Sequence, residues 1–251
     1  MSASDDIAPL LQKWPYDPEN NTRVIDVGDR AVLQVRTPLG IEQYELEGRP
    51  DGARPHGCES LLEHHMDRRQ KALAAGESFR LTEEECEALF QEAVLYYHRY
   101  VYLFQTRDWT GVIRDTTRNL RLFDFVLHYA EREEDRYYLE KWRPYLLRMR
   151  AVAAAMVEVE RERYDQALSI IRAACGRIEA LPGMEDETFQ VERERALEVL
   201  ENLKDYVEMV RPLSPEERLK RDLEAAVARQ EFERAAEIRD KLRALRRRGS
   251  E

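Results

Sequence analysis

The side chains in this sequence that come closest to a metal-ligand set are His56, Cys58, His64 and His65. Imidazole nitrogen and thiolate sulfur are the usual ligands of structural zinc. Adjacent residues on a helix point about 100° apart, so this spacing does not place four donors on one helix face. We therefore predict turn and surface residues here, with no metal site and no cofactor.

Two acidic runs, 83–85 and 131–135, are the candidates for carboxylate chemistry. The first begins a predicted helix, where negative charge is favourable, and the second lies at a helix joint. The sequence has no GxxxxGK[ST] loop, no GxGxxG, no CxxC and no Ser or Cys in a nucleophile signature. We predict that the protein is not an enzyme. The alternative is an enzyme of unrecognised type, with its site between the N-terminal strands and the helices.

A polar groove is a second candidate site. In an aromatic-rich stretch, Tyr97, Tyr100 and Phe104 share one helix face and are predicted to be core. His98, Arg99 and Tyr102 point elsewhere and could form a concave groove with three polar residues of the next helix. Guanidinium and amide groups bind carboxylates well, so such a groove would hold a peptide carboxylate. The alternative is an ordinary solvated helix pair. The groove residues would be Arg99, Tyr102, Arg118, Asn119 and Arg121.

Residues 214–251 have the pattern of two short amphipathic helices. Ser214 is a favourable N-cap, Pro215 suits the first helical position, and Glu217 completes a capping box. One apolar face follows at helical spacing, and a second begins after Phe232. Small residues in the second helix would let the two helices approach closely. The two faces comprise Leu219, Leu223, Ala226 and Val227, then Ala235, Ala236, Ile238, Leu242 and Leu245.

This pair of helices resembles the UVR motif, the helical hairpin near the C-termini of the excinuclease subunits UvrB and UvrC. The string FERAAEIRDKL from Phe232 onward carries the resemblance, together with the apolar residues of the first helix. The resemblance implies binding to another UVR hairpin or to a different protein, with Phe232 at the contact and Arg239 and Asp240 as the polar pair beside it. The implied contact residues are Leu219, Leu223, Ala226, Phe232, Ala235, Ala236, Ile238, Arg239, Asp240 and Leu242.

The resemblance favours a non-catalytic adaptor that docks on a protein partner, or on a second copy of the chain as a homodimer. It would link the chain to excision repair or to a stress-response protease or kinase system. The helicase and nuclease signatures of the excinuclease subunits are missing. A generic hairpin that closes the domain is the alternative interpretation of the same residues.

The N-terminal region contains the β-like alternation of the sequence. Residues 23–48 read as three short strands, separated by turns at Gly28-Asp29 and at Pro38. Ala31, Leu33 and Val35 share one face of the middle strand. A three-stranded antiparallel meander is barely stable alone, so we expect it to pack on the helices that follow.

From residue 58 onward the periodicity is helical, with Thr82 and Glu85 as a capping box. Helices are predicted over 112–130, 136–161, 163–181 and 187–210, and Pro144 would lie early in the second of these or kink it. Trp109, Tyr164 and Phe232 each mark a helix joint, where the aromatic ring is expected to fill the corner between two helices. Their spacing does not match a regular repeat. We predict a mainly α fold of antiparallel, tetratricopeptide-like helical hairpins, with an N-terminal β-meander and a C-terminal hairpin. The predicted parts are a leader and meander at 1–57, a helical body at 58–211 and the UVR-like hairpin at 214–248.

Composition narrows the environment and the partners. The net charge is −10, and the acidic excess lies outside residues 214–251, so a direct nucleic-acid ligand is disfavoured. Arg243 and Arg246–Arg248 are a basic cluster, and a DNA-repair accessory that touches nucleic acid through this tail is the alternative function. No apolar run is long enough for a membrane span, and the N-terminus lacks signal-peptide character. Three widely spaced cysteines favour reduced thiols, so we expect a cytoplasmic protein.

Overall fold

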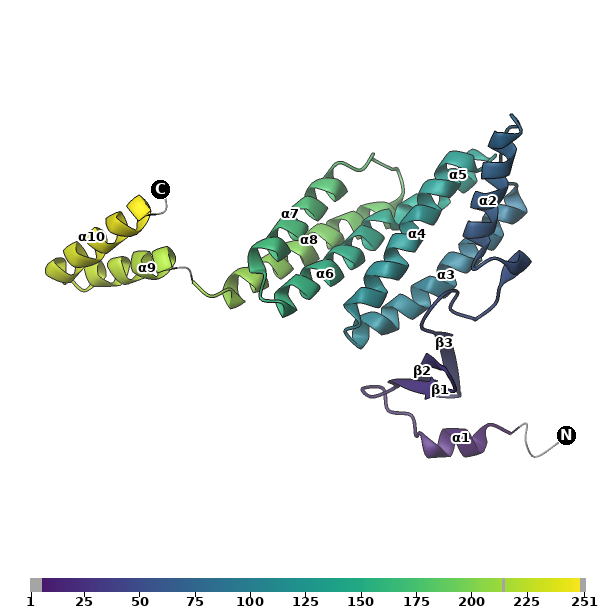
Figure 1. Cartoon of the computed structure of the whole chain (residues 1–251), viewed down its shortest axis with the longest axis horizontal. Coiled ribbons are helices and arrows are strands. Elements are labelled where there is room, and N and C mark those ends of the chain that lie inside the picture. Colours follow the sequence, from purple (N-terminus) through teal and green to yellow (C-terminus); the bar gives the residue numbers. More distant parts are fainter. Residues whose placement is uncertain (1–5, 214, 249–251) are drawn as a thin grey trace. The chain divides into compact units, whose positions relative to one another are not determined.

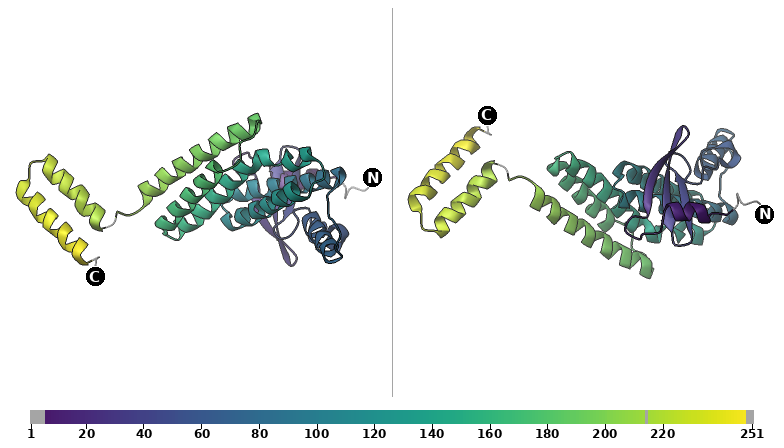
Figure 2. Two further views of the ribbon diagram at one scale, coloured as in Figure 1. Left: turned by 90° about the horizontal axis from the view of Figure 1, so that it is seen from above. Right: turned by 90° about the horizontal axis from the view of Figure 1, so that it is seen from below.

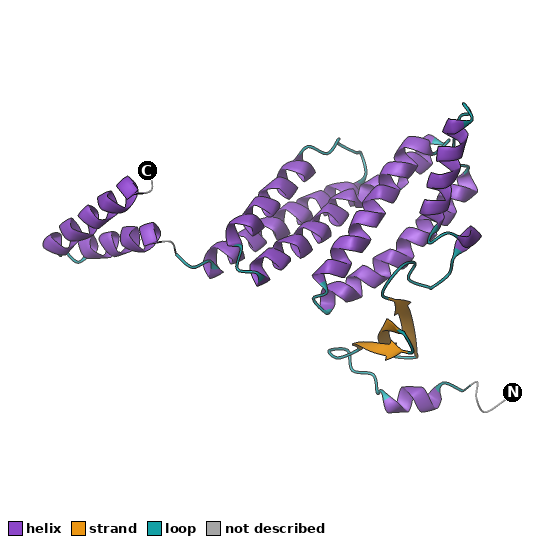
Figure 3. Ribbon diagram, viewed as in Figure 1, coloured by secondary structure: helices purple, strands orange, loops and turns teal. Residues whose placement is uncertain are grey.

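The computed structural model describes residues 6–213 and 215–248, without the side chains of 215, 244 and 246–248. The chain forms two compact units, residues 1–205 and 206–251, and each is described by itself. The described residues form a mainly α fold with a small three-stranded sheet near the N-terminus and helices at the C-terminal end (Figures 1 and 3). The mainly α class and the N-terminal sheet are thus confirmed. Among the described helices, none has the length and apolar character needed to cross a membrane.

The sheet is the predicted antiparallel meander. A short helix, α1 (Ala8–Lys13), precedes strands β1 (Thr22–Val27), β2 (Arg30–Thr37) and β3 (Gly40–Glu45), in the order β1-β2-β3. Leu33 of the central strand lies opposite Val24 on one side and Tyr44 on the other. Gly28, with a φ of 67°, makes the first turn, where a side chain would be strained.

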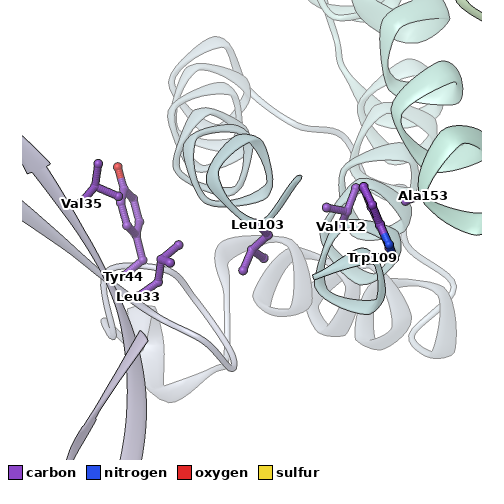
Figure 4. Packing of buried hydrophobic residues seen from close by; sticks show 7 residues of the cluster. All are labelled: Leu33, Val35, Tyr44, Leu103, Trp109, Val112 and Ala153. Carbon is purple, nitrogen blue, oxygen red and sulfur yellow. The ribbon is translucent and has the colours of Figure 1, made fainter. Parts of the chain in front are cut away.

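The sheet packs against the helices of the same unit through one hydrophobic cluster. Leu33, Val35 and Tyr44 of the sheet belong to it, and the helices supply the remaining buried members (Figure 4). Those members are Leu103, Trp109, Val112 and Ala153. The opposite face of β2 is covered as well, because Arg36 is buried and donates a hydrogen bond to the carbonyl of Trp14 at 2.8 Å. Burial on both faces gives this small sheet the support that it needs.

The helices of the first unit pack as antiparallel neighbours. α3 lies against α4, α4 against α6, and α6 against α7 (Figures 1 and 2). Thr82 caps α3, and the reciprocal bond from Glu85 completes the predicted capping box. The elements are α2 (Leu61–Ala74), α3 (Glu83–Gln105), α4 (Trp109–Tyr129), α5 (Glu133–Tyr138), α6 (Arg143–Glu160), α7 (Tyr164–Glu179) and α8 (Glu187–Val210), with short 3-10 turns at Pro55–Gly57 and Glu140–Trp142.

The long helix predicted over 136–161 is wrong at its beginning. The chain instead forms α5, a 3-10 turn and then α6, in which Pro144 occupies the first turn. Proline has no amide hydrogen, and its ring clashes with the carbonyl four residues earlier. A continuous helix through 140–144 is therefore unfavourable, and a fresh start at Arg143 avoids the clash.

The three helix joints marked by an aromatic residue share one backbone conformation. Arg107, Glu162 and Gln230 each adopt a positive φ, at 60°, 58° and 60°. At each joint the amide after this residue bonds to the carbonyl five residues before it, at 2.9, 2.8 and 2.9 Å. This is the Schellman arrangement that ends a helix. The similarity noted among the three joints is thus a repeated turn.

Candidate functional site

The C-terminal candidate site is a hairpin of two helices. α9 (Pro215–Ala228) and α10 (Phe232–Arg248) pack against each other and are joined by the Schellman turn at Gln230. The predicted N-cap, Ser214, lies outside the described residues. Glu217, the other half of that capping box, pairs with Arg211 at 2.5 Å.

The hairpin has a small core of its own. Ala226, Ala235, Ile238 and Leu242 are buried there. Leu219 and Leu223 are partly buried against them, and Ala236 is half-buried beside them. The buried alanines leave room for the close approach that the sequence predicted. These buried side chains pack between the two helices, so they are not available to a partner.

Other predicted residues of the hairpin face outward. Val227 was expected on the apolar face but is 52% exposed, because it is one residue, or about 100°, away from the buried Ala226. Arg239 and Asp240 are exposed on α10, where Asp240 lies 3.7 Å from Arg243. This polar pair is therefore accessible to a partner. Of the predicted basic cluster, Arg243 is exposed, and the side chains of Arg246, Arg247 and Arg248 lie outside the described part.

Phe232 departs from the expectation for an aromatic residue at a helix joint, although its exposure agrees with the contact position that the UVR resemblance implies. An aromatic ring was expected to fill each corner where two helices turn back, and Trp109 does so at 7% exposure. Its ring packs edge-to-face on Phe104 with centroids 5.2 Å apart, and its indole nitrogen donates to Glu160 at 2.6 Å. Phe232 occupies the equivalent position after an equivalent turn but is 69% exposed. In the α3–α4 hairpin, α6 supplies Glu160 and further cover, whereas α9 and α10 leave the Phe232 ring exposed.

An open hollow of about 600 Å³ surrounds this phenylalanine, and we call it the Phe232 hollow. Glu231 pairs with Arg234 at 3.1 Å. Glu233 and Glu237 have no ion-pair partner among the described side chains. These two glutamates belong to the FERAAEIRDKL string but were not predicted as contact residues, although their i, i+4 spacing places like charges on one helix face. The hollow is lined by Gln230, Glu231, Phe232, Glu233, Arg234 and Glu237.

The predicted peptide groove in the helical body is not assembled as expected, because two of its residues are buried. The Arg99 side chain forms a bidentate pair with Asp115, with both distances at 2.7 Å, and donates to the carbonyl of Glu45 at 2.6 Å. Asn119 donates to the carbonyl of Ala93 at 2.9 Å. Both side chains therefore connect elements of the fold instead of lining an open groove.

The helix face of the aromatic stretch is also shifted from the prediction. Tyr97, predicted as core, is 42% exposed, whereas its neighbour Tyr96 is buried. Tyr100 is buried as predicted. Tyr102 packs on Tyr44 of the sheet, with ring centroids 5.8 Å apart, and so belongs to the core side of α3.

The remaining groove residues, Arg118 and Arg121, do line a second, open hollow of about 450 Å³ between α2, α3 and α4. Both are engaged within the chain. Arg118 pairs with the buried Glu92, and Arg121 lies 3.3 Å from Glu63. The arginines of this hollow are therefore paired with carboxylates of the chain itself, whereas the predicted groove would have used them to bind a peptide carboxylate.

The histidine cluster near the start of α2 is packed ring on ring. His56 and His64 stack with centroids 4.0 Å apart, and His65 meets His64 edge-on at 5.2 Å. His65 was predicted as a surface residue but is buried, and its Nδ1 lies 3.0 Å from a guanidinium nitrogen of Arg68. Among the residues that the structure describes, no three His, Cys, Asp or Glu side chains are placed to hold a metal ion.

Comparison with known proteins bears on the C-terminal hairpin alone. The family model of the UvrB/uvrC motif, UVR, matches residues 217–248, which confirms the resemblance. No curated protein and no solved structure matches the chain. The match covers α9 from its third residue, the turn and all of α10. The chain thus carries a UVR motif, which is a protein-interaction motif, in its C-terminal hairpin.

Proposed function

We propose that this protein is a non-catalytic adaptor that docks on a protein partner through its UVR hairpin. The observation that carries the proposal is the exposed Phe232 within the matched motif. Trp109 provides an internal comparison, because after the same turn its ring is buried by a neighbouring helix. We infer that a helix of the partner supplies the corresponding cover for Phe232.

The energetics of such a contact are favourable. Burying a side chain of this size contributes roughly 1.5–3 kcal/mol before ordering costs. The hairpin core is already filled by its own residues. A partner could therefore bind the exposed side chains of the hairpin without disrupting this core. The pathway that we propose is excision repair or a stress-response protease or kinase system, as for other carriers of the motif. The three free thiols support a reducing compartment such as the cytoplasm.

The proposal is tested by affinity capture from the native lysate with two forms of the protein. One is the full chain, and the other stops at Val210, the last residue of α8. We expect a specific protein to be retained by the full chain and lost from the shortened one. Equal retention by both forms would assign recognition to the helical body and contradict the proposed role of the hairpin.

A further inference from the structure

The Phe232 hollow has a charge pattern that restricts what can cover it. Glu233 and Glu237 lie one helical turn apart on α10, and both are exposed. Arg234 is already paired with Glu231. The ring of Phe232 is therefore bordered by two carboxylates that form no ion pair with the described side chains.

Helix stability explains the two carboxylates only in part. Glu233 lies in the first turn of α10, where the helix dipole favours an acid. Glu237 is a turn further on and gains less from the dipole. Glu233 repels it at i−4, and Lys241 is a favourable neighbour at i+4, but the two form no ion pair among the described side chains.

We propose that the Phe232 hollow selects a different protein whose apolar docking surface is bordered by Lys or Arg side chains. This proposal rests on the proposed docking function and specifies the chemistry of its partner. Exposed aromatic rings supply affinity, while complementary charges at the rim fix the choice of partner. The same acidic border repels nucleic-acid phosphates.

The charge pattern also argues against symmetric pairing of two copies through this face. A twofold contact places a surface against its own equivalent. The Phe232 rings would meet, and Glu233 and Glu237 of one copy would then face the same carboxylates of the other. Juxtaposed like charges across an interface oppose such pairing.

The experiment uses a charge-reversed copy of the full chain as a partner with a basic border. The double variant Glu233→Lys/Glu237→Lys retains Phe232 but carries lysines in place of the two carboxylates. Sedimentation at low salt compares the wild type alone, the variant alone and an equimolar mixture. We expect the mixture to associate at least about tenfold more tightly than either chain alone, and added salt to weaken this association.

Two controls separate the proposal from the docking function on which it rests. Asp222→Lys/Glu224→Lys makes the same change of charge on α9, away from the hollow, and should not associate with the wild type. Phe232→Ala in either chain should abolish association in the mixture. Association that persists in the Phe232→Ala variants would contradict the role of Phe232. A mixture no tighter than the wild type alone would overturn the proposed selection by charge.

Discussion

At the scale of single residues, Glu92 shows how a buried charge organises the helical body. Its carboxylate belongs to α3 but accepts hydrogen bonds from the amides of Leu61 at 2.8 Å and Leu62 at 3.2 Å, at the start of α2. It also pairs with Arg118 of α4 and lies 3.5 Å from Arg49. One carboxylate thus satisfies a helix N-terminus and joins three helices, where the positive end of the helix dipole favours it.

Replacing Glu92 with Gln should therefore destabilise the body strongly. The change leaves Arg118 without its carboxylate partner, and breaking a buried pair costs about 3–5 kcal/mol. Urea unfolding of the full chain measures the effect. Glu87→Gln, an exposed change on the same helix, is the control and should shift the free energy of unfolding by less than about 0.5 kcal/mol. Similar values for both variants would show that Glu92 is not a structural anchor.

His65 gives the protein a dependence of stability on pH. Its pKa is lowered from 6.5 to about 4, chiefly by burial, while the charge of Glu85 opposes the shift and that of Arg68 adds to it. The unfolded chain therefore binds a proton below about pH 6.5 that the folded chain does not. The contribution of His65 to the free energy of unfolding is fully present above that pH. It is lost as the pH falls toward 4, and the loss is about 1–2 kcal/mol at about pH 5.

Urea unfolding between about pH 7 and pH 5 tests this expectation. His65→Gln should flatten the slope relative to the wild type, whereas the exposed His98→Gln should keep it. A wild-type slope that survives the removal of His65 would assign the pH dependence to other groups.

At the scale of elements, the repeated turn carries conformational strain. Residues with a side chain pay roughly 1–2 kcal/mol for the left-handed conformation that glycine adopts freely. Glu162, at the joint of α6 and α7, has an exposed side chain that contributes no bond at that position. Glu162→Gly should therefore raise the free energy of unfolding by about 1 kcal/mol.

The matched change is Arg172→Gly, at an exposed position within α7. Glycine in a helix interior should lower stability by about 1 kcal/mol. Opposite shifts in the melting temperature of the two variants are the expected result. A decrease in both would show that the positive φ at Glu162 is not strained.

Sequence reasoning succeeded where local chemistry decides the outcome. The capping box at Thr82, the turn at Gly28 and the UVR hairpin all depend on residues close together in the chain. It failed where the outcome depends on neighbours distant in sequence. The Arg99 side chain is buried because Asp115 and the Glu45 carbonyl receive it. Phe232 does not fill its corner as Trp109 does, because the described residues place no counterpart of α6 over its ring.

At the level of the whole molecule, the chain is divided into two compact units with different contents. The first holds the sheet, the buried ion pairs and the shared core, and the second holds the UVR hairpin. A chain stopped at Val210 should keep the melting temperature of the helical body, measured by calorimetry. A large decrease would show that the hairpin is needed for the stability of the body.

We propose Phe232 as the anchor for a protein partner. The affinity of the purified, captured partner for full-length Phe232→Ala, measured by titration calorimetry, tests this role directly. Leu39→Ala removes a side chain that is 88% exposed in the first unit and serves as the control. We predict that Phe232→Ala weakens binding by more than about 1 kcal/mol and that Leu39→Ala leaves it unchanged. Equal affinity of the Phe232→Ala variant and the wild type would contradict the claim.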